Sequence, residues 1–147
     1  MFIYFFLISA VFSFNSLAID VNQTNNEKGT LIVKFLGLKS SEGNIKLALA
    51  NSKSNYSDHK NPYIGITAEI KNNISIAVIE NIPFGEYAVK AFHDEDANDK
   101  LNTNFLGIPM EDYGFSNNAR GTFGPPSWED AKFQFAKDTL KVEIVIR

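Results

Sequence analysis

The sequence predicts an all-β fold, an antiparallel β-sandwich of about seven strands with one long ordered loop. Three observations lead to this class. Apolar and polar residues alternate with period two in several segments. No segment shows the sustained period of roughly 3.6 residues that marks an amphipathic helix. Gly, Pro, Asn and Asp gather between the alternating segments, where turns would join short strands.

The segments with strand character can be placed along the chain. In order they are residues 30–38, 45–49, 63–70, 74–79, 86–92, 131–136 and 140–146. Leu31, Val33 and Phe35 share one face of the first segment, as a half-buried strand requires. We expect the first two segments to pair as a hairpin and the last two to form a closing hairpin. Segment 86–92 is expected to be central in its sheet.

The chain begins with an apolar segment that is set apart from the fold. Residues 2–14 are almost wholly apolar, which is short for a membrane-spanning helix of about 20 residues. Ser16-Leu17-Ala18 then offers small residues to a signal peptidase. We therefore expect a signal peptide over residues 1–18, a flexible lead-in over 19–29 and one domain over 30–147. The alternative is an uncleaved anchor, since residues 1–18 contain no Lys or Arg.

Export would place the protein in the periplasm, the cell envelope or the extracellular space, with no transmembrane segment after signal removal. The chain has no cysteine, so disulfides, thiol catalysis and cysteine-ligated zinc are excluded. Its formal net charge is −3 with both signs interspersed, which leaves no basic stripe for nucleic acid. Packing, turns and a metal ion are the remaining sources of stability.

Alternation stops between residues 93 and 130, a stretch much longer than the usual connection of about 4–6 residues. Such a loop is typically functional or carries its own ordering agent. It opens with the spacing of a calcium loop, in which oxygen ligands stand at alternate positions and one ligand is a backbone carbonyl. The predicted ligand positions are Asp94, Asp96, Asn98, Lys100 (through its carbonyl) and Asn102.

Two departures from the calcium-loop pattern stand out. Asp99 occupies the sharp turn where glycine is usual, and Phe105 occupies the place of the closing bidentate Glu. Asp tolerates a left-handed backbone better than most residues, so the turn can still form. Glu111 and Asp112, further along the same loop, are the candidates for the missing carboxylate, and Glu95 or Asp99 could contribute less directly. The alternative is an Asx-rich solvated loop without metal, because Asp and Asn form such turns unaided.

Other residues of this region suggest two further kinds of site. His93, with carboxylates among Asp94, Asp96 and Glu111, could supply acid and base groups for hydrolysis, although no catalytic residue is assigned. Exposed aromatic and Arg side chains are typical of binding surfaces. The same aromatics could instead plug an open end of the fold and cover sheet edges. The candidate partner surface consists of Tyr113, Phe115, Arg120, Phe123 and Trp128.

Several motifs together resemble a known family. They are His93-Asp94-Glu95-Asp96-Ala97-Asn98, Asn104-Phe105-Leu106-Gly107-Ile108-Pro109, Gly114-Phe115-Ser116-Asn117-Asn118 and Gly124-Pro125-Pro126. The chain resembles DUF2141, a bacterial family of exported proteins without an established activity, over residues 30–147. The resemblance implies Gly at position 99 and often Asp at position 102, so Asp99 and Asn102 lower the expected cation affinity. The strand-to-loop junction is also similar to transthyretin-like and carboxypeptidase-regulatory-like sandwiches of Greek-key type, an analogy of fold alone.

These observations favour an exported, non-catalytic binding or accessory domain of the bacterial envelope with a loop stabilised by Ca²⁺. Its partner would be an envelope protein or polymer of unknown identity. Two alternatives remain: a hydrolase that acts on a cell-envelope polymer through loop carboxylates, and a structural or assembly protein that uses a sheet edge.

Overall fold

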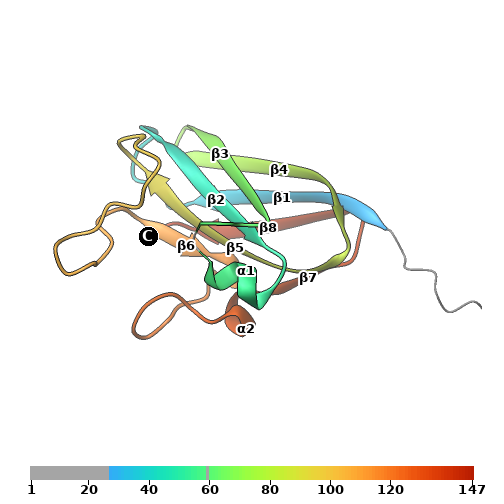
Figure 1. Cartoon of the computed structure of the whole chain (residues 1–147). Helices are drawn as coiled ribbons and strands as arrows, with labels where there is room; N and C mark the ends of the chain where they lie inside the picture. The colour runs from blue at the N-terminus through green and yellow to red at the C-terminus, as the bar shows by residue number, and fades with distance from the viewer. Residues whose placement is uncertain (1–26, 59) are drawn as a thin grey trace, which may run out of the picture.

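The protein is an all-β domain, as the sequence predicts (Figure 1). The computed structural model describes residues 27–58 and 60–147. The predicted signal peptide, and the lead-in as far as residue 26, lie outside the described residues. The strands are β1 (Lys28–Leu36), β2 (Asn44–Ala50), β3 (Ile64–Lys71), β4 (Ile74–Pro83), β5 (Gly85–Asp94), β6 (Tyr113–Phe115), β7 (Phe133–Phe135) and β8 (Thr139–Val145). The helices are short: α1 (Lys53–Ser57), η1 (Ser116–Asn118) and α2 (Trp128–Ala131).

The strands form one continuous, barrel-like sheet that is nearly closed. Their order is β6-β5-β2-β3-β4-β1-β8, and β7 pairs with β5 outside this path. All pairs are antiparallel except β1 with β8, which run parallel. The two ends of the path meet where Arg147 N–H donates to the carbonyl of Tyr113 at 3.1 Å. Two separate sheets, as a sandwich requires, are therefore not confirmed.

Both predicted hairpins are wrong. Strand β1 pairs with β4 and β8, whereas β2 pairs with β3 and β5. At the end of the chain, β7 pairs with β5 and β8 pairs with β1. Period-two alternation shows which face of a strand is buried but leaves its partner open, which explains the error. Segment 86–92 is central as predicted, because β5 lies between β2 and β6 in the sheet.

Two clusters of buried side chains hold the sheet together. The larger one lies inside the curved sheet and includes Leu31, Val33, Phe35, Phe135 and Ile144. The smaller one lies outside it, between β5, α1 and α2. In this second cluster the rings of Tyr56 and Trp128 meet edge to face, with centroids 5.9 Å apart. The inner cluster therefore carries the alternating residues of the strands, and the outer one anchors the long loop.

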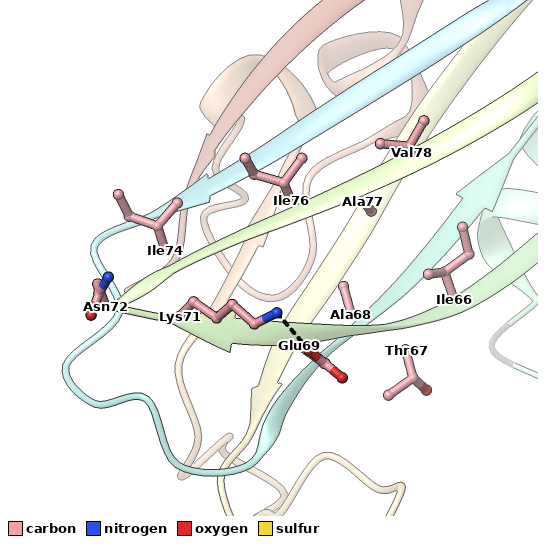
Figure 2. A pocket seen from close by; sticks show the side chains of 10 residues that line it. All are labelled: Ile66, Thr67, Ala68, Glu69, Lys71, Asn72, Ile74, Ile76, Ala77 and Val78. Atoms are coloured by element: carbon pink, nitrogen blue, oxygen red, sulfur yellow. Dashed lines mark ion pairs between the residues drawn. The ribbon is translucent and has the colours of Figure 1, made fainter.

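The sheet is open along one seam, between β3 and β4. These strands pair only at Ile70 with Ser75 and at Lys71 with Ile74, next to their turn. Beyond that point they diverge and leave a groove of about 610 Å³ (Figure 2). Its apolar lining comes from Ile66, Ala68, Ile74, Ile76, Ala77 and Val78. Within the described part of the chain, no helix is long and apolar enough to cross a membrane.

Candidate metal centre

Strand β5 ends in a carboxylate that organises the loop after it. Asp94 is fully buried and lies opposite Asn44 of β2. Its Oδ1 accepts a hydrogen bond from the N–H of Asn98, and its Oδ2 accepts one from the N–H of Asp99, both at 3.0 Å. These bonds wind residues 94–99 into a tight turn. Asp99 has φ of 65° in this turn, so it takes the left-handed position in which glycine is usual.

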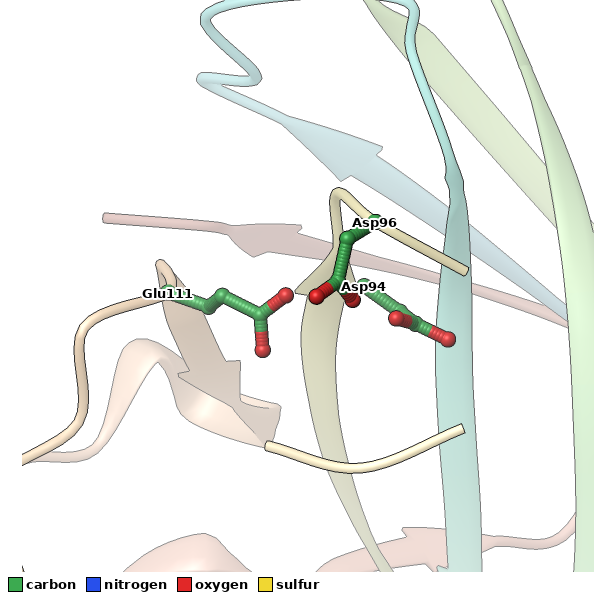
Figure 3. Close-up of side chains that lie close together, drawn as sticks. All are labelled: Asp94, Asp96 and Glu111. Carbon is green, nitrogen blue, oxygen red and sulfur yellow. The ribbon is translucent and has the colours of Figure 1, made fainter. Parts of the chain in front are cut away.

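Two further carboxylates converge on Asp94 (Figure 3). Ligand oxygens of Asp94, Asp96 and Glu111 all lie within 4.8 Å of one another. Asp94 and Glu111 are buried, whereas Asp96 is exposed, so the cluster faces solvent on the Asp96 side. Asp112, the other candidate for closing the ligand set, instead pairs with Lys39 at 2.7 Å. The long loop thus returns Glu111 to the place where the calcium-loop pattern lacks its carboxylate.

Glu111 also links the two ends of the loop through its hydrogen bonds. Its Oε1 accepts from the N–H of Glu95 at 3.0 Å, and its Oε2 accepts from the N–H of Asn102 at 2.8 Å. Each carboxylate oxygen can accept about two hydrogen bonds or a metal contact besides one bond. The hydrogen bonds to Glu111 therefore hold its carboxylate in place, and each oxygen can still contact a metal ion.

Side-chain amides surround the exposed carboxylate. The Nδ2 groups of Asn98 and Asn102 donate to Oδ2 of Asp96 at 2.8 and 3.0 Å. The pKa of Asp96 is lowered from its ordinary value of 3.8, first because the Asn102 side chain donates to it and further through Asn98. Asp96 is therefore ionised at neutral pH, as a ligand for a hard cation must be.

Two lysines differ sharply in their relation to this cluster. Lys100, predicted to offer its carbonyl, lies exposed on the turn, where its N–H donates to Oδ1 of Asn98 at 2.8 Å. Lys46 on β2 pairs with Asp99, and its Nζ lies 3.9 Å from Oδ2 of Asp94. Lys46 thus offsets part of the negative charge of the cluster from the sheet side.

On the opposite side, Asp96 faces a shallow depression of about 390 Å³. The depression is lined by Glu95, Asp96, Asn102, Thr103, Met110 and Glu111.

His93 lies beside the cluster but does not line the depression. Its ring is fully buried, and Nε2 lies 2.7 Å from the carbonyl oxygen of Glu42. A carbonyl only accepts, so Nε2 carries a proton and donates it there. Nδ1 lies 3.7 Å from Oε1 of Glu95. His93 therefore secures the β2 side of the sheet to β5, and no lining atom of the depression belongs to it.

One comparison with known proteins identifies a family. A family model described as an uncharacterized protein conserved in bacteria (DUF2141) matches residues 33–143. The chain belongs to this family. No curated protein and no solved structure matches it. The family resemblance expected from the motifs is confirmed, and the matched region of this DUF2141 chain contains the whole carboxylate cluster.

The aromatic surface expected on the DUF2141 chain is divided by the structure. Phe115 and Trp128 are buried in the outer cluster, and Tyr113 packs against them. Arg120 and Phe123 are exposed. Phe115 and Trp128 therefore expose little surface to a partner, and their rings hold the long loop against β5 and α1. The plug interpretation describes the packing of Phe115 and Trp128 but not the exposed Phe123.

Two contributors to the site escaped the sequence analysis. Lys46 appears in the sequence only as the polar residue of an alternating strand, and the pairing of β2 with β5 brings it to Asp94. Gly43 precedes the same strand, and its Cα lies so close to Asp94 that an added Cβ would meet the carbonyl oxygen at 2.0 Å. Both depend on the partner of β2, which alternation does not reveal.

The amide bonds to Asp96 lead to a prediction about its ionisation. Replacing Asn102 by alanine removes the main cause of the lowered pKa, so the pKa of Asp96 should rise toward 3.8. Because the pKa of the folded state is lowered, these bonds stabilise the fold above pH 3.8 and are lost as the pH falls through the pKa. NMR titration of the Asp96 carboxyl carbon measures the change. Asn104→Ala is the control, and an equal shift in both variants would contradict the assignment.

Proposed function

We propose that this protein is an exported, non-catalytic binding or accessory domain of the bacterial envelope whose acidic loop is stabilised by Ca²⁺. One observation carries the proposal, the convergence of Asp94, Asp96 and Glu111 within 4.8 Å. Three carboxylates at this separation repel one another, and Lys46 supplies a single positive charge on one side. A divalent cation held from the depression would offset the remaining charge.

The oxygen ligands of the cluster suit a hard cation. Carboxylate and carbonyl oxygens are the ligands that Ca²⁺ prefers, at about 2.3–2.6 Å. Asp94, Asp96 and Glu111 would hold the ion, and Asn102 could join them after a rotation of its amide, which now donates to Asp96. Both amide oxygens are already acceptors, Oδ1 of Asn98 from the N–H of Lys100 and Oδ1 of Asn102 from Nδ2 of Asn98, so either residue must give up a hydrogen bond or share its oxygen to bind the ion. Few ligands and one protein ammonium nearby suggest weak binding, with Kd of about 10⁻⁴–10⁻³ M as in extracellular calcium modules.

A hydrolase ranks second for a structural reason. A general acid or base must reach a substrate proton within about 3 Å, directly or through one water. His93, the proposed acid or base, is fully buried and does not line the depression. Assembly through a sheet edge ranks third, and the unpaired stretch between β3 and β4 favours it over other structural roles.

Thermal unfolding tests the proposed calcium site. A ligand that binds only the native state stabilises it by about 2.7 kcal/mol at a hundredfold excess over Kd. Calcium at about 10 mM, tenfold or more above the expected Kd, should raise the melting temperature relative to chelator. Magnesium should substitute poorly, because it demands a smaller octahedral shell.

Asp96→Ala separates binding from folding. The carboxylate of Asp96 is exposed and accepts hydrogen bonds from amides of its own loop, so its loss should change stability little in chelator. The variant should nevertheless lose the calcium response. Asp138→Ala, an exposed aspartate near the start of β8, is the matched control and should keep it. Identical melting of the parent protein in chelator and in calcium would show that the loop is an Asx-rich turn without a metal role.

A further inference from the structure

The long loop carries an apolar tip that the proposed cation site does not explain. Residues 101–110 contain no charged side chain, although charged residues make up 21% of the chain. Five large apolar side chains in this segment face solvent, the first of which is Leu101. Phe105 is 95% exposed and Met110 is 72% exposed, with Leu106 and Ile108 between them also exposed. The segment lies in the extended loop between β5 and β6 (Figure 1). We call residues 104–110 the apolar tip.

Most backbone N–H groups of the apolar tip donate hydrogen bonds to acceptors within the same loop. Asn104 makes most of these bonds. Its Oδ1 accepts from the N–H groups of Leu106 and Ile108 at 2.9 and 3.1 Å. Its carbonyl accepts from Gly107 at 2.9 Å, and its own N–H donates to the carbonyl of Ile108 at 2.9 Å.

Two further positions fit the same pattern, whereas the N–H of Phe105 donates to no other described residue. The N–H of Met110 donates to the carbonyl of Asn102 at 2.8 Å, and Pro109 has no N–H to satisfy. A segment that enters hydrocarbon must satisfy its backbone groups internally, because lipid tails offer no partners. A surface loop in water has no such requirement. The tip is therefore apolar in its side chains and largely self-satisfied in its backbone donors.

We propose that the apolar tip inserts into the interfacial region of a lipid membrane. Phe, Leu, Ile and Met side chains without neighbouring charges are suited to the boundary between headgroups and acyl chains. A protein partner that recognised the tip through ion pairs would need charged groups there, and residues 104–110 carry none. The tip anchors the described domain to a membrane surface.

This inference stands apart from the proposed cation site. The tip has its apolar side chains with or without a bound ion. The carboxylates of Asp96 and Glu111 lie at its base, so they would oppose approach to anionic lipid in chelator. Vesicles of zwitterionic phosphatidylcholine, tested in chelator, therefore examine the tip alone. Failure there would leave the calcium melting experiment unaffected.

Vesicle sedimentation with matched isoleucine variants is the first test. Ile108 in the tip and Ile76 on β4 are both 55% exposed, so Ile108→Ser and Ile76→Ser change the exposed apolar surface alike. Every variant keeps the same apolar residues 2–14. Any contribution of this segment to vesicle binding is therefore equal in all of them and does not affect the comparison. We expect Ile108→Ser to weaken partition onto phosphatidylcholine vesicles and Ile76→Ser to leave it unchanged. Phe105→Ser should weaken it by about tenfold. Equal effects of the two isoleucine variants, or no partition of the parent protein, would overturn the proposal.

Fluorescence locates the tip within the bilayer. The chain has one tryptophan, Trp128, which is buried, so Phe105→Trp adds a reporter at the tip. With vesicles of phosphatidylcholine brominated along the acyl chains, the Phe105→Trp protein should show quenching and a blue shift that the parent protein lacks. Vesicle binding without quenching at position 105 would assign membrane contact to another part of the chain and reject the inserted tip.

Discussion

Gly43→Ala should lower the free energy of unfolding by about 3 kcal/mol, since it combines a left-handed backbone cost with a steric overlap. Gly43 has φ of +66°, a conformation that residues with a Cβ rarely adopt. The new Cβ would also lie 2.0 Å from the carbonyl oxygen of Asp94, and this backbone atom cannot turn aside as a side chain does. Relief of the overlap must separate the start of β2 from the end of β5, where Asn44 pairs with Asp94.

Gly107→Ala provides a control for the backbone cost alone. Gly107 has φ of +76°, but an added Cβ would meet no atom within 4 Å. We expect this variant to lose only about 1–2 kcal/mol, the cost of a left-handed conformation. Urea unfolding of both variants in chelator gives the two free energies. Equal losses would mean that the end of β5 yields to the new methyl group, and the close approach of Gly43 would not constrain the site.

Much of the strand content was predictable from alternation, whereas strand partners were not. Leu31, Val33 and Phe35 alternate and are all fully buried, as the pattern indicates. The same alternation fits an antiparallel neighbour on one side and a parallel one on the other, which is the arrangement found for β1. Strand β6 was missed because three residues are too few to show a period. Local pattern sets the buried face, and the closure of the sheet sets the partners.

The carboxylate cluster was partly predictable for a similar reason. Asp94 and Asp96 stand two residues apart on one turn, so their convergence follows from local spacing. Glu111 was only one of two candidates, and the return of the loop beside β5 brings it to the cluster. The apolar tip had a signal in the sequence, the absence of charge over residues 101–110. Its exposure was not evident, because apolar residues in a long loop can equally pack against the sheet.

Asp94→Ala should destabilise the protein by about 3 kcal/mol even in chelator, because it leaves several groups without their partner. The N–H groups of Asn98 and Asp99 lose their acceptors, and the ammonium of Lys46 keeps only Asp99 as a carboxylate partner. Loss of one buried acceptor costs about 1–3 kcal/mol for each group left unsatisfied, and water reaches part of this exposed turn. The expected cost is therefore well above that of Asp96→Ala.

Comparing Asp94→Ala with Asp96→Ala distinguishes a structural role of a carboxylate from a role in cation binding. Asp96→Ala should cost much less than Asp94→Ala in chelator, because the side chain of Asp96 is exposed. Both variants should lose the calcium response, since each removes one of three converging carboxylates. Urea unfolding in chelator gives the free energies, and hydrogen exchange of the Asn98 and Asp99 amides reports the turn locally. These two amides should exchange faster in Asp94→Ala than in Asp96→Ala. Similar stability and exchange in the two variants would show that water replaces Asp94 as the acceptor, and Asp94 would then have no structural role beyond cation binding.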